Sequence, residues 1–166
     1  MKVDKKLYEI IKHSGIDIIL SVPCILLKDL LNLINEKNEI LHIPLTREEE
    51  GIGIAAGAYL GGGFPIILIQ NSGIGNSVNA IKSLLGLYEI PIIFLISQRG
   101  GKDEEIIAQM PMGYITEKLL KLIGIKTWSI KSYKEISKFK KAIVYCKKSS
   151  HSVGVLLQKS LWRDSR

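Results

Sequence analysis

Three consecutive glutamates, Glu48, Glu49 and Glu50, stand immediately before a run of glycine, alanine and isoleucine that reaches Tyr59. The small residues predict a tightly packed helix after a short apolar strand, with the carboxylates in its first turn. Carboxylates at such a place usually interact with the helix dipole and stay solvated. A carboxyl that enters a tightly packed helix instead borders dry space, where it can hold a proton near neutral pH. We therefore expect a catalytic acid among the three.

A second segment of chemical interest, residues 70–79, turns from a predicted strand into a predicted helix. Gly73 and Gly75 allow a ligand to approach the backbone, and the first N–H groups of the helix can bind it. The third glycine of a dinucleotide-binding fingerprint is missing, and so is the Gly-Lys-Ser/Thr of a phosphate-binding loop. The alternative is an ordinary turn in which Asn71 or Ser72 caps the helix.

Single residues at two other strand ends are candidates for ligand contacts. Arg99 follows the most apolar predicted strand and precedes two glycines, so its guanidinium could bind a carboxylate, sulfonate or phosphonate. The alternative is a solvated loop arginine. Cys24 follows a proline at a strand end and could face a ligand, although a buried structural thiol is the alternative. The three histidines have no spacing typical of a metal site or a catalytic triad, and we expect no metal ligands in this chain.

The composition favours one globular domain over residues 1–166, with 46% hydrophobic and 23% charged residues. The net charge of +7 suits anionic small substrates, because the lysines are spread over predicted helix surfaces and no nucleic-acid-binding module accompanies them. Nucleic-acid binding is the weaker alternative. Two distant cysteines predict no disulfide framework. The N-terminus lacks the apolar core of a signal peptide, and no apolar run is long enough to cross a bilayer, so we expect a cytoplasmic protein.

Strand and helix patterns alternate along the chain. The expected strands are residues 17–22, 39–43, 65–70, 91–97, 126–130 and 153–157. The expected helices are residues 4–13, 26–34, 47–60, 76–85 and 116–123 and a lysine-rich helix within 131–148, with a polar loop over 98–110. Near-continuous Ile and Leu strands predict a doubly wound α/β domain, with a six-stranded, mainly parallel sheet and helices on both faces. Ligands of such sheets bind at the carboxyl ends of the strands, where the candidate residues lie.

Four segments together resemble the pyrimidine-binding (PYR) half of thiamine-diphosphate-dependent decarboxylases. They are Thr-Arg-Glu-Glu-Glu-Gly-Ile-Gly-Ile-Ala-Ala-Gly at 46–57, Val-Pro-Cys-Ile-Leu-Leu-Lys-Asp-Leu-Leu at 22–31, Gln-Asn-Ser-Gly-Ile-Gly-Asn at 70–76, and Gln-Arg-Gly-Gly at 98–101. Within that superfamily they are similar to the sulfopyruvate and phosphonopyruvate decarboxylases. The short chain resembles the alpha subunits of the former along nearly its whole length.

The resemblance implies the thiamine-diphosphate-binding fold of PYR type and thiamine diphosphate as the cofactor. It implies that a glutamate binds the cofactor's pyrimidine ring and favours loss of the thiazolium C2 proton. Alignment on Gly57 and Gly63 selects Glu48 as this residue, whereas alignment on the two alanines at 55–56 selects Glu49. We choose Glu48 and expect Glu50 to be structural or solvated. The remaining cofactor-binding candidates are Asn71, Gly73, Gly75 and Asn76, and the substrate-binding candidates are Cys24 and Arg99.

The resemblance also implies a partner. Full-length relatives carry a Gly-Asp-Gly motif that precedes a metal-binding Asn in a diphosphate-binding domain, and this sequence has no Gly-Asp-Gly. A beta subunit would therefore hold the diphosphate and Mg²⁺ in a hetero-oligomer. The implied reaction converts 3-sulfopyruvate to sulfoacetaldehyde and CO₂ in coenzyme M biosynthesis. The alternatives are another 2-keto acid, phosphonopyruvate above all, or a non-catalytic partner subunit.

Overall fold

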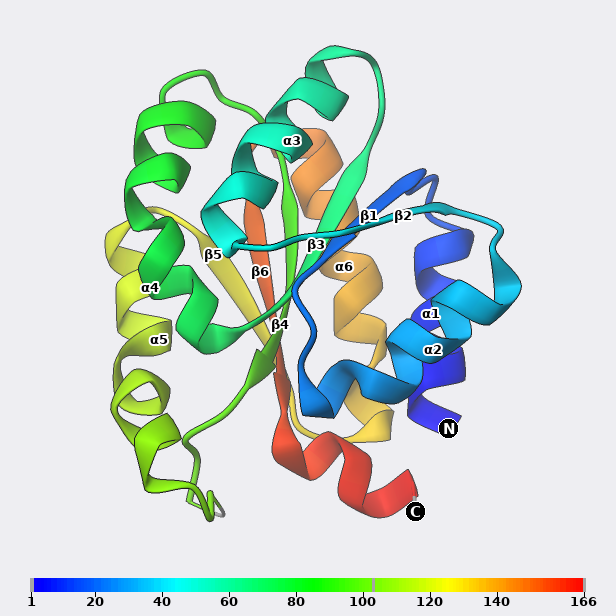
Figure 1. The fold of residues 1–166 in the computed structure, drawn as a ribbon, viewed down its shortest axis with the longest axis vertical. Helices are drawn as coiled ribbons and strands as arrows, with labels where there is room; N and C mark the ends of the chain where they lie inside the picture. The colour runs from blue at the N-terminus through cyan, green and yellow to red at the C-terminus, as the bar shows by residue number, and fades with distance from the viewer. Residues whose placement is uncertain (1, 103, 166) are drawn as a thin grey trace.

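The computed structural model describes residues 2–102 and 104–165, which form three layers, with a central sheet between two layers of helices (Figure 1). The sheet has six strands in the order β2-β1-β3-β4-β6-β5, and every neighbouring pair is parallel. The strands are β1 (Ile18–Ser21), β2 (Leu41–Pro44), β3 (Pro65–Gln70), β4 (Ile93–Gln98), β5 (Lys126–Ile130) and β6 (Val153–Gln158). The predicted doubly wound α/β fold is confirmed.

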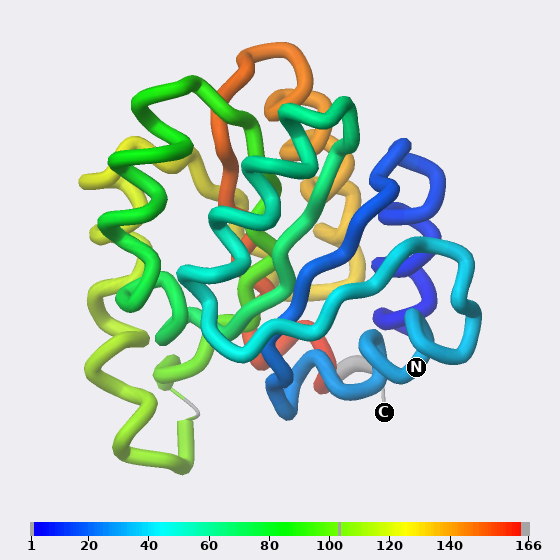
Figure 2. The backbone as a smooth tube through the Cα atoms, turned by 45° about the horizontal axis from the view of Figure 1, so that its top comes forward, coloured from blue at the N-terminus to red at the C-terminus, as the bar shows by residue number. Residues whose placement is uncertain are grey.

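Helices cover both faces of the sheet, as the two views of the backbone show (Figures 1 and 2). One face carries α1 (Lys2–Lys12), α2 (Lys28–Lys37) and α6 (Ser137–Ser149). The other carries α3 (Glu48–Leu60), α4 (Asn71–Ala80) and α5 (Met110–Leu122). Short helical segments complete the described chain: η1 (Ile25–Leu27), η2 (Ile81–Gly86), η3 (Ile107–Gln109), η4 (Tyr133–Glu135) and η5 (Lys159–Ser165).

The period of two along the central strands divides the core between the two faces. In β3, Ile66 and Leu68 join the cluster under α1, α2 and α6, while Ile67 and Ile69 join the cluster under α3, α4 and α5. All four side chains are fully buried. Because both faces are covered, a continuous apolar run is the pattern that this strand requires.

Two helices begin five or more residues earlier than their sequence patterns predict. Helix α4 begins at Asn71, directly after β3 and five residues before the expected start. Helix α5 begins at Met110, six residues before the expected start, and Pro111 occupies its first turn, where the missing N–H needs no partner. The expected loop over residues 98–110 is therefore shorter, and residue 103 in it lies outside the described residues. Both extensions bring helix starts close to the carboxyl ends of β3 and β4, which lie toward the bottom of Figure 1.

Candidate active site

Glu48, the first residue of α3, extends its side chain across to α4. A Cβ added to Gly73 would lie 2.4 Å from Glu48 Cγ, so the carboxyl group lies directly against the bare backbone of α4. Asn76 Nδ2 donates a hydrogen bond to Glu48 Oε2 at 3.1 Å. The structure thus brings together three predicted site residues that come from two separate segments of the sequence.

The other two glutamates have different partners. Glu49 Oε1 lies 2.6 Å from Arg47 Nη2, and its Oε2 is buried with no hydrogen-bond partner among the described residues. Glu50 Oε2 accepts a hydrogen bond from the backbone N–H of Thr46 at 3.3 Å, which stabilises the start of α3. The structural role expected for Glu50 agrees with this contact. Only Glu48, of the three, makes a hydrogen bond to α4 in the described part of the chain.

Asn71 is fully buried and faces the interior rather than the first turn of α4. Its Oδ1 accepts from the Arg99 N–H at 3.1 Å, and its Nδ2 donates to Arg99 O at 3.2 Å and to Thr116 Oγ1 at 3.0 Å. The alternative expectation of a capping Asn71 or Ser72 was wrong, because Gln70 holds the N-cap position and no side chain caps the helix. These hydrogen bonds connect Asn71, in α4, to the residue that follows β4 and to α5. The role of Asn71 in cofactor binding stays a prediction.

A row of polar side chains crosses the carboxyl ends of β1, β3 and β4. Cys24 Sγ lies 3.1 Å from Ser97 Oγ and donates to Gln70 Oε1 at 3.5 Å. Gln70 Nε2 in turn donates to Gln109 Oε1 at 2.6 Å and to Ser72 Oγ at 2.9 Å. Cys24 is 9% exposed, so its thiol lies at the border between the core and the surface. Gln70, Ser97 and Gln109 were not predicted as site residues. For Gln70 and Ser97 the sequence did contain a signal, because each is a polar residue at the end of a buried strand.

Arg99 is buried in an ion pair with Glu104, and the expectation of a solvated loop arginine was wrong. Arg99 Nε and Nη2 donate to the two carboxylate oxygens of Glu104 at 2.7 and 2.6 Å. The backbone N–H groups of Gly100 and Ile106 also donate to Glu104, at 3.1 and 3.2 Å. The Glu104 side chain is 1% exposed, and its bonds to Arg99 lower its pKa to about 2. The same bonds raise the pKa of Arg99.

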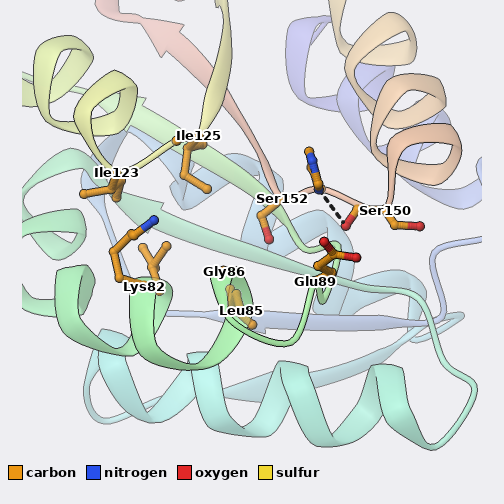
Figure 3. Close-up of a pocket in the computed structure, with 11 residues that line it drawn as sticks. Lys82, Leu85, Gly86, Glu89, Ile123, Ile125, Ser150 and Ser152 are labelled. Carbon is orange, nitrogen blue, oxygen red and sulfur yellow. Dashed lines mark hydrogen bonds between the residues drawn. The ribbon is translucent and has the colours of Figure 1, made fainter.

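A cavity lies at the opposite end of the sheet, and none of the predicted site residues lines it (Figure 3). It measures about 160 Å³ and lies at the amino ends of the strands, between η2 and the turns that precede β5 and β6. Lys82 and Glu89 contribute charges of opposite sign to its wall. The hydroxyl of Ser152 is already satisfied, since it donates to Ile90 O and accepts from Ile92 N–H.

Two further observations concern the described residues as a whole. No helix in this part of the chain combines the length and the apolar character needed to cross a membrane. Residues 2–102 and 104–165 also contain no group of three or more His, Cys, Asp or Glu side chains arranged to hold a metal ion.

The six-stranded parallel sheet with helices on both faces is the fold expected of a thiamine-diphosphate-binding domain, and comparison with known proteins agrees. Residues 1–120 match the family described as thiamine pyrophosphate enzyme, N-terminal TPP binding domain. The chain belongs to this family.

Three curated relatives span all or nearly all of this chain. The chain is 46% identical to the sulfopyruvate decarboxylase subunit alpha of Methanococcus maripaludis, over 100% of both proteins. It is 48% identical to the protein of the same description in Methanocaldococcus jannaschii, over 98% of this chain and 96% of that protein. The sulfopyruvate decarboxylase of Methanosarcina acetivorans is 37% identical over 98% of this chain, which corresponds to 41% of that longer protein.

Proposed function

We propose that this chain, as a single PYR domain over residues 1–166, is the alpha subunit of a thiamine-diphosphate-dependent decarboxylase that converts 3-sulfopyruvate to sulfoacetaldehyde and CO₂. The observation that carries the proposal is the Glu48 carboxyl, which lies at the start of α3 against Gly73 with one oxygen bound by Asn76. Full-length similarity to two sulfopyruvate decarboxylase alpha subunits supports the choice of substrate.

The residues around Glu48 fit the pyrimidine end of the cofactor. Gly73 leaves room for the Glu48 side chain, and the space beside Gly75 is limited only by the flexible end of Met112 at 3.3 Å. Glu48 would bind the ring nitrogen, and Gly73, Gly75 and Asn76 would line the ring. When bound, thiamine diphosphate supplies the electron sink that accepts the electron pair released as the keto acid loses CO₂.

The contribution of Glu48 to the reaction is to hold a proton at a fixed place. Asn76 fixes Oε2, whereas Oε1 has no hydrogen-bond partner among the described residues and is left to share its proton with a ligand nitrogen. A positioned proton donor or acceptor of this kind contributes about 10²- to 10⁴-fold to a rate. Cys24 would border the keto acid, since its thiol lies at the carboxyl end of β1 beside Ser97.

The full-length relatives are described as alpha subunits, which supports a second polypeptide for the diphosphate end of the cofactor. This chain has no Gly-Asp-Gly, and it corresponds to less than half of the longer relative from Methanosarcina acetivorans. We therefore assign Mg²⁺ and the diphosphate to a beta subunit in a hetero-oligomer. A tagged chain should co-purify from its own cells with a protein that contains Gly-Asp-Gly, and purification as a lone subunit would contradict this assignment.

Matched variants of adjacent glutamates test the role of Glu48. In the complex with the beta subunit, Glu48→Gln should lower kcat for sulfopyruvate by at least about 100-fold. Glu49→Gln should keep most of the activity, because Glu49 is paired with Arg47. Hydrogen–deuterium exchange at the cofactor's C2 gives a second measurement that does not depend on substrate. The reverse order of effects would assign the role to Glu49, and full activity in both variants would make the chain a scaffold.

The nearest alternative is the same chemistry on phosphonopyruvate, because the segments around Cys24 and Gly73 also resemble phosphonopyruvate decarboxylases. Supplying each keto acid to the same complex and measuring aldehyde formation decides between them. Arg99 is the sulfonate ligand that the sequence predicts, although two of its guanidinium nitrogens already donate to Glu104. An unchanged KM for sulfopyruvate in Arg99→Ala would remove it from substrate binding.

A further inference from the structure

An open pocket of about 440 Å³ lies at the carboxyl ends of β1 and β2, against α2. Its volume is in the range typical of small-molecule sites. Cys24 lines this pocket and also belongs to the polar row with Ser97 and Gln70, so one thiol borders both regions. The lining residues are Ser21, Pro23, Cys24, Ile25, Lys28, Leu31, Asn32, Asn35, His42 and Pro44.

One face of α2 forms a wall of this pocket. Lys28, Leu31, Asn32 and Asn35 are spaced i, i+3, i+4 and i+7, which places them on the same side of a helix. Lys28 is the only Lys or Arg among the lining residues, and no Asp or Glu lines the pocket. Within the described part of the chain, no ion pair or hydrogen bond occupies the Lys28 ammonium group. The wall therefore presents an uncompensated positive charge beside two amides.

His42 adds no charge to the pocket. Its Nδ1 lies 2.7 Å from Asn35 Oδ1, which can only accept, so Nδ1 carries the hydrogen. Its Nε2, at 2.8 Å from Ser21 Oγ, then accepts from the hydroxyl. Burial lowers the pKa of His42, in agreement with this neutral form. Both ring nitrogens are engaged, so an anion in the pocket would meet Lys28 and the asparagine amides.

The substrate of the proposed reaction has two anionic groups, and the carboxylate is the one that leaves as CO₂. Arg99, the cation predicted from sequence for the second group, already has two of its guanidinium nitrogens bound by the buried Glu104. Lys28 has no ion-pair partner among the described residues and belongs to a pocket that shares Cys24 with the proposed reaction site. We propose that this pocket binds the sulfonate of the substrate through Lys28, with the Asn32 amide as a second donor; this inference rests on the proposed function.

Binding of an unreactive analogue tests the proposal without turnover. 3-Sulfopropanoate has the carbon chain and both anions of sulfopyruvate but no keto group, so it cannot be decarboxylated. We would titrate it calorimetrically into the alpha–beta complex that carries thiamine diphosphate and Mg²⁺. Lys28→Met should weaken binding by about tenfold or more, since a charge-assisted hydrogen bond is lost. Lys28→Arg should restore most of the affinity because the positive charge is kept.

Lys118→Met is the matched control. Lys118 is an exposed lysine of α5, on the opposite face of the sheet from α2, and its removal changes the net charge by the same amount. It should leave the dissociation constant unchanged. Equal affinities in wild type, Lys28→Met and Lys118→Met would overturn the proposal, as would the absence of binding to the wild-type complex.

Kinetics separate this inference from the proposed function. If the wild-type complex decarboxylates sulfopyruvate, Lys28→Met should raise KM by about tenfold while kcat changes much less. A KM that stays at the wild-type value refutes the role of Lys28 and leaves the proposed function intact. If the wild-type complex does not turn over sulfopyruvate, the proposed function fails, and the calorimetric comparison still decides whether Lys28 binds a sulfonate.

Discussion

The buried pair of Arg99 and Glu104 allows a quantitative prediction of stability. Bonds from Arg99 hold the pKa of Glu104 at about 2, against an ordinary value of 4.5. Each pKa unit corresponds to about 1.4 kcal/mol, so the depression represents roughly 3 kcal/mol of folding free energy. Removal of one charge from a buried ion pair typically costs about 3–5 kcal/mol, which agrees with this figure. We therefore expect Glu104→Gln to lower the free energy of unfolding by about 3 kcal/mol at pH 7.

The sign of the pH dependence follows from the direction of the pKa change. A carboxyl whose pKa is lower in the folded chain makes its full contribution to folding stability at pH values above its unfolded pKa. This contribution is lost as the pH falls through the folded pKa. The difference between wild type and Glu104→Gln should thus be constant above about pH 5 and shrink between pH 4.5 and 2. Urea denaturation, followed by circular dichroism at a series of pH values, measures this difference in the free energy of unfolding.

The neighbouring residue provides the control for Glu104→Gln. The Glu105 side chain is 90% exposed and lies 3.5 Å from Lys159, and such surface pairs contribute about 0–1 kcal/mol. Glu105→Gln should therefore change stability by no more than about 0.5 kcal/mol. For a domain of this size, 3 kcal/mol corresponds to a fall in Tm of roughly 6–12 °C. The reasoning is refuted if the two variants unfold alike at pH 7.

Two pairs of glycine variants test the geometry of the site. Gly73→Ala should lower kcat of the complex by about 100-fold, since the new Cβ would lie 2.4 Å from Glu48 Cγ and displace the carboxyl group. Gly53→Ala, in α3, should keep most of the activity because its Cβ meets nothing within 4 Å; equal kinetic effects would contradict the assignment of Glu48. Gly100→Ala should destabilise the chain by about 2 kcal/mol or more, because Gly100 has a φ of +79° and its Cβ would lie 2.3 Å from Gln109 O. Gly101→Ala, whose Cβ meets nothing within 4 Å, is its control in thermal unfolding, and similar melting temperatures would show that Gly100 is not constrained.

Local sequence patterns were sufficient to predict the fold. Apolar runs such as residues 65–70 and 91–97 predict buried parallel strands, because a strand covered on both faces needs no polar side. Helix starts were harder to predict. Asn71 reads as a capping residue when only its neighbours are considered, yet its amide bonds to Arg99 and Thr116, which are 28 and 45 residues away.

The sequence by itself determined where chemistry could occur: at strand ends, in the first turn of a small-residue helix, and beside the paired glycines of residues 70–76. It could not determine which glutamate meets α4, because Glu48 and Glu49 differ only in their direction around one helical turn. The tertiary structure decided this by placing Gly73 and Asn76 against Glu48. It likewise paired Arg99 with Glu104 and gathered Lys28, Cys24 and His42 around one pocket. Periodicity indicates which face of an element is buried, whereas only the packing of distant elements determines which side chains meet there.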